Sequence, residues 1–306
     1  MKQNSELFER YFIKEYTIKA VRKFFENKNY HELESPILTD SLPQERYLDA
    51  LYTDITLQNG ESKRAYLIPS TETWNKKILV AGLGNHFVIT KVFRGLEEIG
   101  PNHSPEFTML EWYQVGDNYF DLMDTTEELV RYIITFINEK SERPHPVPIN
   151  RNHPLLKGEG YKLNYQGQEI DFGTKWDRFS VRELLRKHVN IELEEIELVE
   201  NFRKIAIEKG FEITDQDDWQ TIFEIIFSSA VEPNFAKDKP TFVYDFPRIL
   251  CPLTKVKESD PLVSEKTEFY IAGKEIGNGY TELTDWEEQK RRFDEEQAER
   301  EKLGKE

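Results

Sequence analysis

The stretch from Lys91 to Gln114, KVFRGLEEIGPNHSPEFTMLEWYQ, decides the fold of this chain. Its two ends are rich in Val, Phe, Trp and Tyr, whereas its middle is polar and holds two glycines and two prolines. This pattern predicts two strands, His86 to Arg94 and Glu106 to Val115, joined by a polar loop. Because side chains alternate along a strand, Glu111 and Tyr113 should share one face of the sheet.

The remaining segments predict an irregular order of helices and strands. This order favours an α+β fold, in which an antiparallel sheet is flanked by helices, over a regular βαβ series. Apolar spacing predicts helices at 6–27, 72–83, 119–138 and 285–302, and strands at 30–35, 54–58, 65–68, 241–246 and 267–283. Asn59-Gly60 is a turn signal between two of these strands.

The middle of the chain differs in composition from its two ends. The segment from Lys140 to Pro154 contains PHPVPINRNHP, which cannot be helical throughout. The segment from Val181 to Glu232 follows a mostly helical pattern. We therefore expect one domain over 1–306 that includes a linker and a mainly helical insertion over 141–235.

Composition excludes several classes of protein. The 306 residues carry a formal net charge of −16, and such a surface repels phosphate backbones. Cys251 is the single cysteine, so neither a disulfide framework nor a zinc site built from cysteines is possible. The charged N-terminal MKQNSELFERYFIKEY contains no apolar signal core, and no run approaches the ~20 apolar residues of a membrane span. We expect a cytoplasmic protein that does not interact with membranes.

Several strings together point to one family. The order Phe93-Arg94, Glu97, His103, then PEFT at 105–108 and EWY at 111–113 resembles motif 2 of the class II aminoacyl-tRNA synthetases. Tyr30 to Pro36 resembles motif 1 of the same family. STE at 70–72 resembles the family's substrate-amine loop, and two further strings resemble its lysine subgroup, PTFVYDFP at 240–247 and GKEIGNGYTEL at 273–283.

Within the lysine subgroup, the chain is most similar to the stand-alone paralogue that modifies elongation factor P. The strings that carry this similarity are ILVAGLGNHF at 78–87, FTMLEWY at 107–113 and VEPNFAKDKPTFVYDFP at 231–247. The chain also begins at the catalytic domain, so an anticodon-binding domain and tRNA binding are not expected. The resemblance implies that ATP activates lysine or (R)-β-lysine as an acyl-adenylate. A lysine side chain of elongation factor P then accepts the acyl group, and the enzyme is a homodimer.

The resemblance also implies a set of site residues. Arg94 would be catalytic and would contact the α-phosphate, and Mg²⁺ would be held by Glu268 and Glu275. ATP contacts are implied for Arg94, Glu97, Ser104, Glu275 and Ile276, and substrate contacts for Ser70, Thr71, Glu72, Glu111, Tyr113, Asn278 and Glu282.

The arrangement of the two proposed metal ligands can be argued from pairing. A tight turn at Ala272-Gly273 would set Tyr270 opposite Glu275, and Glu268 would lie diagonally on the same face, roughly 7–8 Å away at the backbone. Two carboxylates at this spacing suit a hard cation that also binds phosphate. A solvated hairpin with ordinary glutamates is the alternative. The face of the sheet to which Glu282 points stays open, because the glycines of GNG at 277–279 can introduce a bulge.

Three departures from the family pattern leave alternatives open. The loop after Arg94 is one residue longer, so either Glu97 or Glu98 is the acid of motif 2. Ser104 replaces an asparagine that is usual in the family. The chain stops before motif 3, so we expect slow or absent adenylation by these 306 residues alone. A lysine-activating enzyme with another acceptor and a catalytically impaired binding protein are the competing interpretations.

Overall fold

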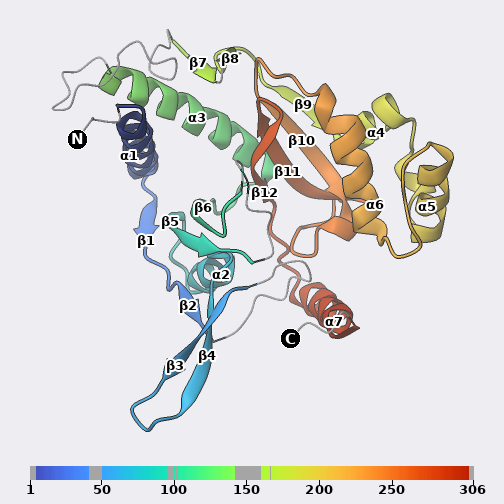
Figure 1. Ribbon diagram of the computed structural model, residues 1–306, viewed down its shortest axis with the longest axis horizontal. Coiled ribbons are helices and arrows are strands. Elements are labelled where there is room, and N and C mark those ends of the chain that lie inside the picture. The colour runs from blue at the N-terminus through green and yellow to red at the C-terminus, as the bar shows by residue number, and fades with distance from the viewer. Residues whose placement is uncertain are drawn as a thin grey trace. The chain divides into compact units, whose positions relative to one another are not determined.

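The computed structural model describes residues 5–40, 50–95, 100, 103–141, 160–165 and 167–302. The chain forms two compact units, which are described separately here. Unit 1 comprises Met1–Ala20 and Asp117–Gln289, and unit 2 comprises Val21–Gly116 and Lys290–Glu306. Helices α1 (Ser5–Asn27) and α7 (Trp286–Lys302) each contribute residues to both units (Figure 1). Among the described residues, no helix is long and apolar enough to cross a membrane.

Unit 2 is built on the strand pair that the sequence predicts. Its sheet has the order β1-β5-β6, with β1 at His31–Leu33, β5 at His86–Phe93 and β6 at Glu106–Tyr113. Strands β5 and β6 are antiparallel, and β1 runs parallel to β5. Phe25 of α1 covers one face, with its ring centroid 4.8 Å from Phe87 and 5.6 Å from Trp112.

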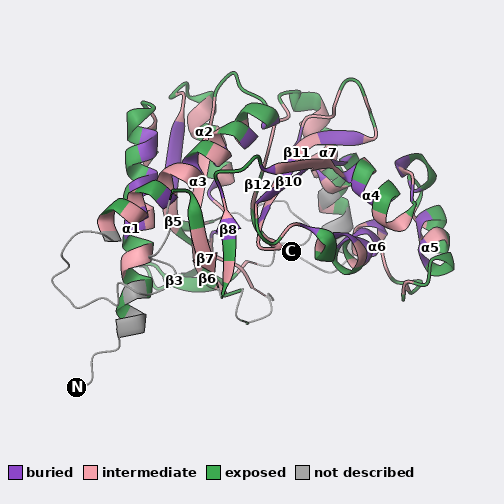
Figure 2. Ribbon diagram, turned by 90° about the horizontal axis from the view of Figure 1, so that it is seen from above, coloured by how far each residue is buried: buried purple, intermediate pink, exposed green. Residues whose placement is uncertain are grey.

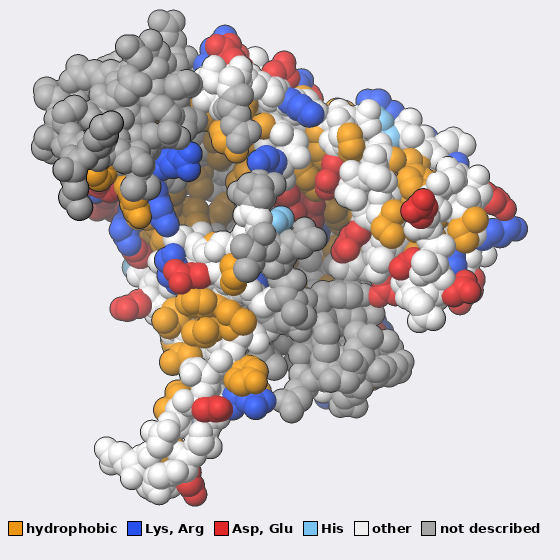
Figure 3. Space-filling view, in the orientation of Figure 1, with side chains coloured by type: hydrophobic (Ala, Val, Ile, Leu, Met, Phe, Trp, Pro, Cys, Tyr) orange, Lys and Arg blue, Asp and Glu red, His pale blue; other side chains and the backbone are white. Residues whose placement is uncertain are grey.

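A second small sheet in unit 2 confirms the predicted hairpin. Its order is β2-β4-β3, with β2 at Leu38–Thr39, β3 at Tyr52–Thr56 and β4 at Ser62–Leu67. Gly60 lies in the connecting turn with φ +87°, a conformation that suits glycine. Exposed apolar side chains gather on this sheet (Figure 3), namely Leu38, Leu51, Tyr52, Ile55 and Leu57. Helix α2 follows β4 at Glu72–Val80.

Unit 1 contains a four-stranded sheet of order β12-β11-β10-β9. Its strands are β9 (Asp177–Ser180), β10 (Thr241–Pro247), β11 (Val263–Ile271) and β12 (Lys274–Tyr280). The pairs β10–β11 and β11–β12 are antiparallel, and β9 runs parallel to β10. The predicted α+β architecture, antiparallel strands flanked by helices, is confirmed, with parallel pairings at the edge strands β1 and β9.

The segment over 141–235, expected as a linker and a mainly helical insertion, also contains strands. Strands β7 (Lys162–Tyr165) and β8 (Gln168–Asp171) form a hairpin there, and β9 follows them. Strand β9 is only four residues long, and its partner β10 lies about 60 residues later in the chain, so local pattern does not reveal it. Residues 142–159, which include most of the Pro-rich segment, lie outside the described part of the chain.

Helices cover both faces of the four-stranded sheet. On one face, α4 (Val181–Val189), α5 (Val199–Glu208) and α6 (Trp219–Ile226) share a core with Val243. On the other, α3 (Tyr119–Ser141) and the β7–β8 hairpin share a core with Phe242 and Trp176. Buried residues, drawn purple in Figure 2, are frequent on α4 and α6. Trp176 and Trp219 are buried and therefore pack the interior.

Short helical turns complete unit 1. They are η2 (Leu193–Glu195), the π-helical η3 (Phe227–Val231), η4 (Glu232–Asn234) and η5 (Arg248–Leu250). Helix α6 continues through η3 into η4, and this carries the chain from the helical layer to Glu232 beside the sheet. Burial of Tyr270 against Phe235, with ring centroids 4.8 Å apart, packs this turn on β11.

Candidate functional site

Glu111 is the centre of a hydrogen-bond network in unit 2. Its Oε1 accepts from Ser70 Oγ at 2.6 Å and from the Thr71 backbone N–H at 3.0 Å. Its Oε2 accepts from Thr71 Oγ1 at 2.7 Å, Asn75 Nδ2 at 3.3 Å and Tyr113 Oη at 3.5 Å. The network therefore joins strand β6 to the segment before α2 and to the first turn of that helix.

The Ser70–Thr71–Glu72 segment is held by these bonds. Ser70 Oγ also accepts from the Glu72 backbone N–H at 3.0 Å, and Thr71 is buried. Glu72 begins α2 and pairs with Lys76 one turn later, with Oε1 and Nζ 2.6 Å apart. The carboxylate of Glu72 thus lies at the N-terminus of a helix, where negative charge is favourable.

Tyr113 shares its face of β6 with Glu111, as strand alternation predicts. Its directly paired residue on β5 is His86, and the two rings stack with centroids 5.2 Å apart and 17° between their planes. His86 is fully buried, and its Nδ1 lies 2.8 Å from the carbonyl oxygen of Gly84. This stack fixes the ring of Tyr113 and so the direction of its hydroxyl.

Arg94 lies where β5 leads into the motif 2 loop. Its Nε donates to the carbonyl oxygen of Pro69 at 3.2 Å, and its guanidinium lies 5.4 Å from the ring centre of Phe107. These contacts connect Arg94 to the residue that precedes the Ser70–Thr71–Glu72 segment. Ser104 is exposed. Glu97 and Glu98 lie outside the described residues, so the choice between them stays open.

The second group of expected residues lies in unit 1, on the hairpin of β11 and β12. The predicted register is confirmed at the turn, where Ile271 pairs with Lys274 and Tyr270 pairs with Glu275. A bulge follows, because Phe269 pairs with Gly277 and the exposed Ile276 is the extra residue. The bulge lies at Ile276, one residue before the Gly277-Asn278-Gly279 string where the sequence allowed a bulge.

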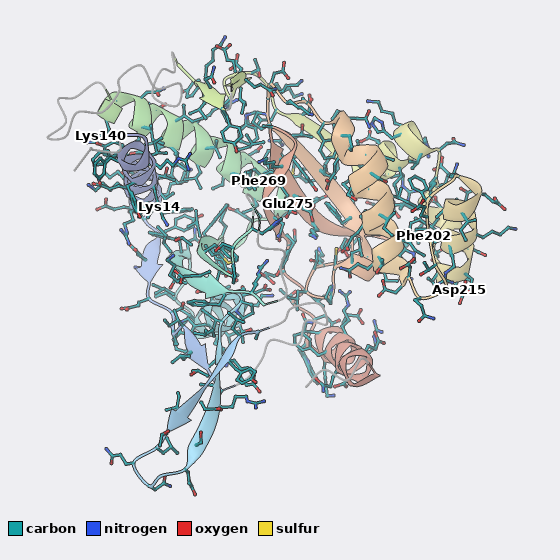
Figure 4. The ribbon with its side chains drawn as sticks, viewed as in Figure 1. Lys14, Lys140, Phe202, Asp215, Phe269 and Glu275 are labelled. Carbon is teal, nitrogen blue, oxygen red and sulfur yellow. The ribbon has the colours of Figure 1, made fainter. Side chains whose placement is uncertain are left out.

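This bulge decides which side chains share a face. Glu268 pairs directly with Asn278, so these two residues point to the same side as Tyr270 and Glu275. Asn278 hydrogen-bonds the carboxylate of Glu275. Figure 4 labels Glu275 on β12 and Phe269 on β11. Without the extra residue, Glu275 and Asn278, three positions apart, would point to opposite faces of the strand.

The two glycines beside Asn278 have a packing role on the other face. A Cβ on Gly277 would lie 2.9 Å from the ring of Phe269, and one on Gly279 would lie 2.2 Å from Leu122 of α3. Both distances are too short for real contacts, so any side chain here would displace its neighbour. The GNG string therefore places a polar residue on one face and leaves space on the other.

Charge is concentrated around the hydroxyl of Tyr270. Glu268 Oε2 accepts from Tyr270 Oη at 2.8 Å, and Glu268 Oε1 lies 2.8 Å from Lys266 Nζ. Glu232 Oε1 lies 3.3 Å from the same hydroxyl. Loss of hydration and the charge of Glu268 raise the pKa of Glu275 to about 7. Burial lowers the pKa of Lys266, but the nearby Glu268 and Glu275 carboxylates raise it by more.

The Glu268 and Glu275 pair fits a hard cation. Their oxygens are the donors that Mg²⁺ prefers, and their mutual repulsion is what a divalent cation would relieve. Within the part of the chain that the structure describes, no three His, Cys, Asp or Glu side chains are close enough to hold a metal by themselves. Ligands from another molecule, such as phosphate oxygens, would therefore have to complete the coordination.

Glu282 lies beyond the end of β12, the strand that carries Glu275. It forms an isolated antiparallel bridge with Thr254, and the Leu283 N–H donates to Leu253 at 3.1 Å. This pairing keeps the chain extended beyond the end of β12 at Tyr280. Strand alternation from Asn278 then assigns Glu282 to the same face as Asn278 and Glu268.

Sequence reasoning missed three members of these networks. Asn75 is fully buried and lies four residues after Thr71, so helical spacing was the available signal. Tyr270 and Glu232 meet only in the tertiary structure, since 38 residues separate them. No local pattern marks Glu232 as different from the other acidic residues of this region.

Comparisons with known proteins agree with this architecture. The sequence model of the family described as "tRNA synthetases class II (D, K and N)" matches residues 2–306. The chain is 31% identical over 291 residues to a protein of Legionella pneumophila (strain Corby) named "Lysine--tRNA ligase", covering 95% of this chain and 53% of the relative. It is 33% identical over 294 residues to a protein of the same name from Pelotomaculum thermopropionicum, covering 95% and 52%.

A third relative, from Clostridium acetobutylicum and also named "Lysine--tRNA ligase", is 32% identical over 307 residues, covering 97% of this chain and 53% of the relative. The chain thus spans about half the length of the curated relatives it matches. The family match covers both units and both candidate groups of residues. The chain therefore belongs to the class II tRNA synthetases of the D, K and N group.

Proposed function

We propose that this protein uses ATP to activate lysine or (R)-β-lysine as an acyl-adenylate. The observation that carries the proposal is the pairing of a carboxylate and a phenol on one face of β6, where Glu111 and Tyr113 lie 3.5 Å apart. Through Glu111 this face is bonded to Ser70 and Thr71, directly before the carboxylate of Glu72. The Glu72 carboxylate and the Tyr113 hydroxyl favour a substrate with amines and disfavour neutral side chains.

The proposed reaction needs positioning rather than an obligatory acid or base. A carboxylate oxygen of lysine attacks the α-phosphorus of ATP, a new O–P bond forms, and the bond to pyrophosphate breaks. Arg94 binds the α-phosphate, and Glu97, Ser104 and Ile276 contact the rest of ATP. When bound, Mg²⁺ would neutralise phosphate charge, and Glu268 and Glu275 would be its protein ligands.

The substrate amines are assigned to the remaining residues. Glu72 accepts the amine nearer the carboxyl group, with Ser70 and Thr71 shaping its surroundings. The resemblance assigns the far amine to Glu282 and Tyr113, and it adds Asn278 to the substrate-binding residues. This division rests on the resemblance to lysine-activating enzymes, and the direct pairing of Glu268 on β11 with Asn278 on β12 supports it.

The acceptor of the acyl group is a separate part of the proposal. Resemblance to the paralogue that modifies elongation factor P favours a lysine side chain of that protein. The net charge of −16 supports a protein acceptor over a polyanion. The relatives are named for ligation of lysine to tRNA, which makes tRNA the second candidate.

Binding and exchange measurements together test the proposal. Calorimetry should show binding of lysine and β-lysine but not of norleucine, which lacks the far amine. Exchange of labelled pyrophosphate into ATP should depend on whichever of the two amino acids binds more tightly. Absence of lysine and β-lysine binding would refute the proposal, whereas binding without exchange would favour the catalytically impaired binding protein. Labelled lysine offered to elongation factor P and to tRNA in parallel then identifies the acceptor.

A further inference from the structure

The carboxylate of Glu111 has its hydrogen-bonding capacity filled by the protein. Two carboxylate oxygens offer about four acceptor positions. Five donors lie within 3.5 Å of them, and four of these donors come from Ser70, Thr71 and Asn75. A substrate ammonium would have to displace one of these donors before it could bind Glu111.

The hydroxyls of Ser70 and Thr71 each donate one bond and accept another. Ser70 Oγ donates to Glu111 and accepts from the Glu72 N–H. Thr71 Oγ1 donates to Glu111 and accepts from Asn75 Nδ2 at 2.8 Å. Each hydroxyl therefore has one donated and one accepted bond, and the direction of every bond in the chain is fixed.

The side chain of Thr71 bonds to this network and does not cap helix α2. It is the N-cap residue of α2, a position where a threonine side chain ordinarily accepts from the first turn of the helix. Here it makes no side-chain cap bond, and its hydroxyl points instead to Glu111. The bond to Glu111 thus replaces helix capping by Thr71. This indicates that the contact with β6, rather than the helix, determines the conformation of this segment.

We propose that Glu111 is a positioning residue that builds the Ser70–Thr71–Glu72 segment and does not itself bind the substrate amine. Glu72 then makes the amine contact, and Glu111 acts by holding the backbone from which Glu72 projects. The effect of Glu111 on lysine binding rests on the proposed function. The positioning of the segment itself can be tested without any ligand.

Hydrogen exchange of the ligand-free chain is the first test. The Thr71 N–H donates directly to Glu111, so Glu111→Gln should accelerate exchange of the amides at 71–75 by about tenfold or more. Thr71→Val should have the same effect, because it removes the hydroxyl from the buried network. Thr71→Ser keeps that hydroxyl and should exchange like the parent chain.

Glu106→Gln is the matched control. Glu106 lies on the same strand and pairs with Lys91 at 2.6 Å, but both side chains are largely exposed. The same chemical change there should leave exchange at 71–75 unaltered. Unchanged exchange at 71–75 in Glu111→Gln, or equal acceleration in Glu106→Gln, would overturn the proposal.

Lysine affinity separates positioning from direct contact. If Glu111 acts by holding the segment in its competent conformation, variants that break the network should raise the Kd for lysine, because the competent conformation becomes less populated. Thr71→Val should therefore weaken lysine binding as much as Glu111→Gln does, and the double variant should be no weaker than either. If Thr71→Val binds lysine like the parent while Glu111→Gln does not, Glu111 contacts the substrate and the proposal is wrong. If the parent binds neither lysine nor β-lysine, the proposed function fails, and the exchange result alone decides the positioning role.

Discussion

At the scale of single residues, one inserted residue and one network determine what the candidate site can do. Ile276 is the extra residue of the bulge in β12, and it turns Asn278 to the face that carries Glu268 and Glu275. The carboxylate of Glu111 accepts hydrogen bonds from Ser70 and Thr71. Two glutamates that look equivalent in the sequence, Glu111 and Glu275, therefore have different surroundings and are expected to have different roles.

The assignment of Glu282 to the far amine leads to a prediction. Glu282→Gln should weaken lysine binding by a few kcal/mol, because a substrate ammonium would lose its charged partner in a partly desolvated site. The same variant should discriminate less well against norleucine. Calorimetric titration of parent and variant with both compounds measures the two effects. Unchanged lysine affinity would exclude Glu282 as the partner of the far amine.

The pKa of Glu275 gives a prediction for stability against pH. Its folded-state pKa of about 7 lies above its ordinary value of 4.5, so the folded chain holds the proton more strongly. Its contribution to stability is therefore present below pH 4.5 and is lost as the pH rises towards 7. Glu275→Gln should remove this loss, which we expect to be about 1 kcal/mol because the exposed side chain is partly screened.

Urea unfolding of the metal-free chain at pH 5 and pH 8, in the presence of a chelator, measures this difference. The parent should lose more stability than Glu275→Gln between the two pH values. Glu287→Gln, on the exposed first turn of α7, is a control that should follow the parent. An equal loss in all three chains would contradict the raised pKa.

At the scale of elements, the contact between β12 and α3 depends on the absence of a side chain. A Cβ at Gly279 would overlap Leu122 Cδ2, which lies 2.2 Å from the ideal position. Nearby, the Tyr119 N–H at the start of α3 donates to Thr281 Oγ1 at 3.0 Å. Tyr119 Oη also donates to the buried Asp245 of β10 at 2.7 Å, so the helix is tied to two strands of the sheet.

Gly279→Ala should therefore destabilise unit 1. We expect a loss of about 1–3 kcal/mol, the usual cost of overpacking a well-packed contact. Leu122→Ala removes the overlapping group, so the double variant should be less destabilised than the sum of the two single variants. Denaturant unfolding of the four chains of this cycle measures the coupling. Strict additivity would show that Leu122 does not oppose a side chain at position 279.

At the scale of the whole molecule, the net charge and the oligomeric state affect which partners the chain can bind. The formal net charge of −16 belongs to the full sequence and disfavours contact with polyanions. Each unit has its own sheet and its own candidate residues. The homodimer implied by motif 1 stays a proposal, to be tested together with the expected preference for a protein acceptor.

The charge predicts weak binding to nucleic acid. At about 150 mM salt, we expect the Kd for unrelated duplex RNA to be no tighter than about 100 μM, the weak end of non-specific binding. Filter binding at two salt concentrations measures the affinity and its salt dependence. Micromolar binding with a steep salt dependence would contradict this prediction and would indicate a local basic patch on a surface of negative net charge.

The dimer prediction concerns the segment from Glu32 to Pro36 and the first helix. Ile37 follows this segment and is 42% exposed, so Ile37→Asp should convert a dimer to a monomer by placing a charge in the interface. Ile207→Asp is a control at a similarly exposed isoleucine on α5. Light scattering at micromolar concentration measures the mass of each chain. A monomeric parent, or equal dissociation in both variants, would contradict this interface.

The sequence by itself determined many of the elements and the family. Helix α1, the β3–β4 hairpin, strands β5 and β6, and the turn that pairs Tyr270 with Glu275 follow from periodicity and turn residues, which act over a few positions. The resemblance to the class II synthetases follows from strings of the same short length, and the family match confirms it.

The tertiary structure alone decided what depends on distant partners. Strand β9 exists because β10 offers it a hydrogen-bonding edge, and the bulge at Ile276 follows from pairing with β11. The saturation of Glu111 depends on Ser70 and Thr71, about 40 residues earlier in the chain. Such contacts are set by packing and hydrogen bonding between segments that meet only after folding, and a local sequence window contains just one partner of each.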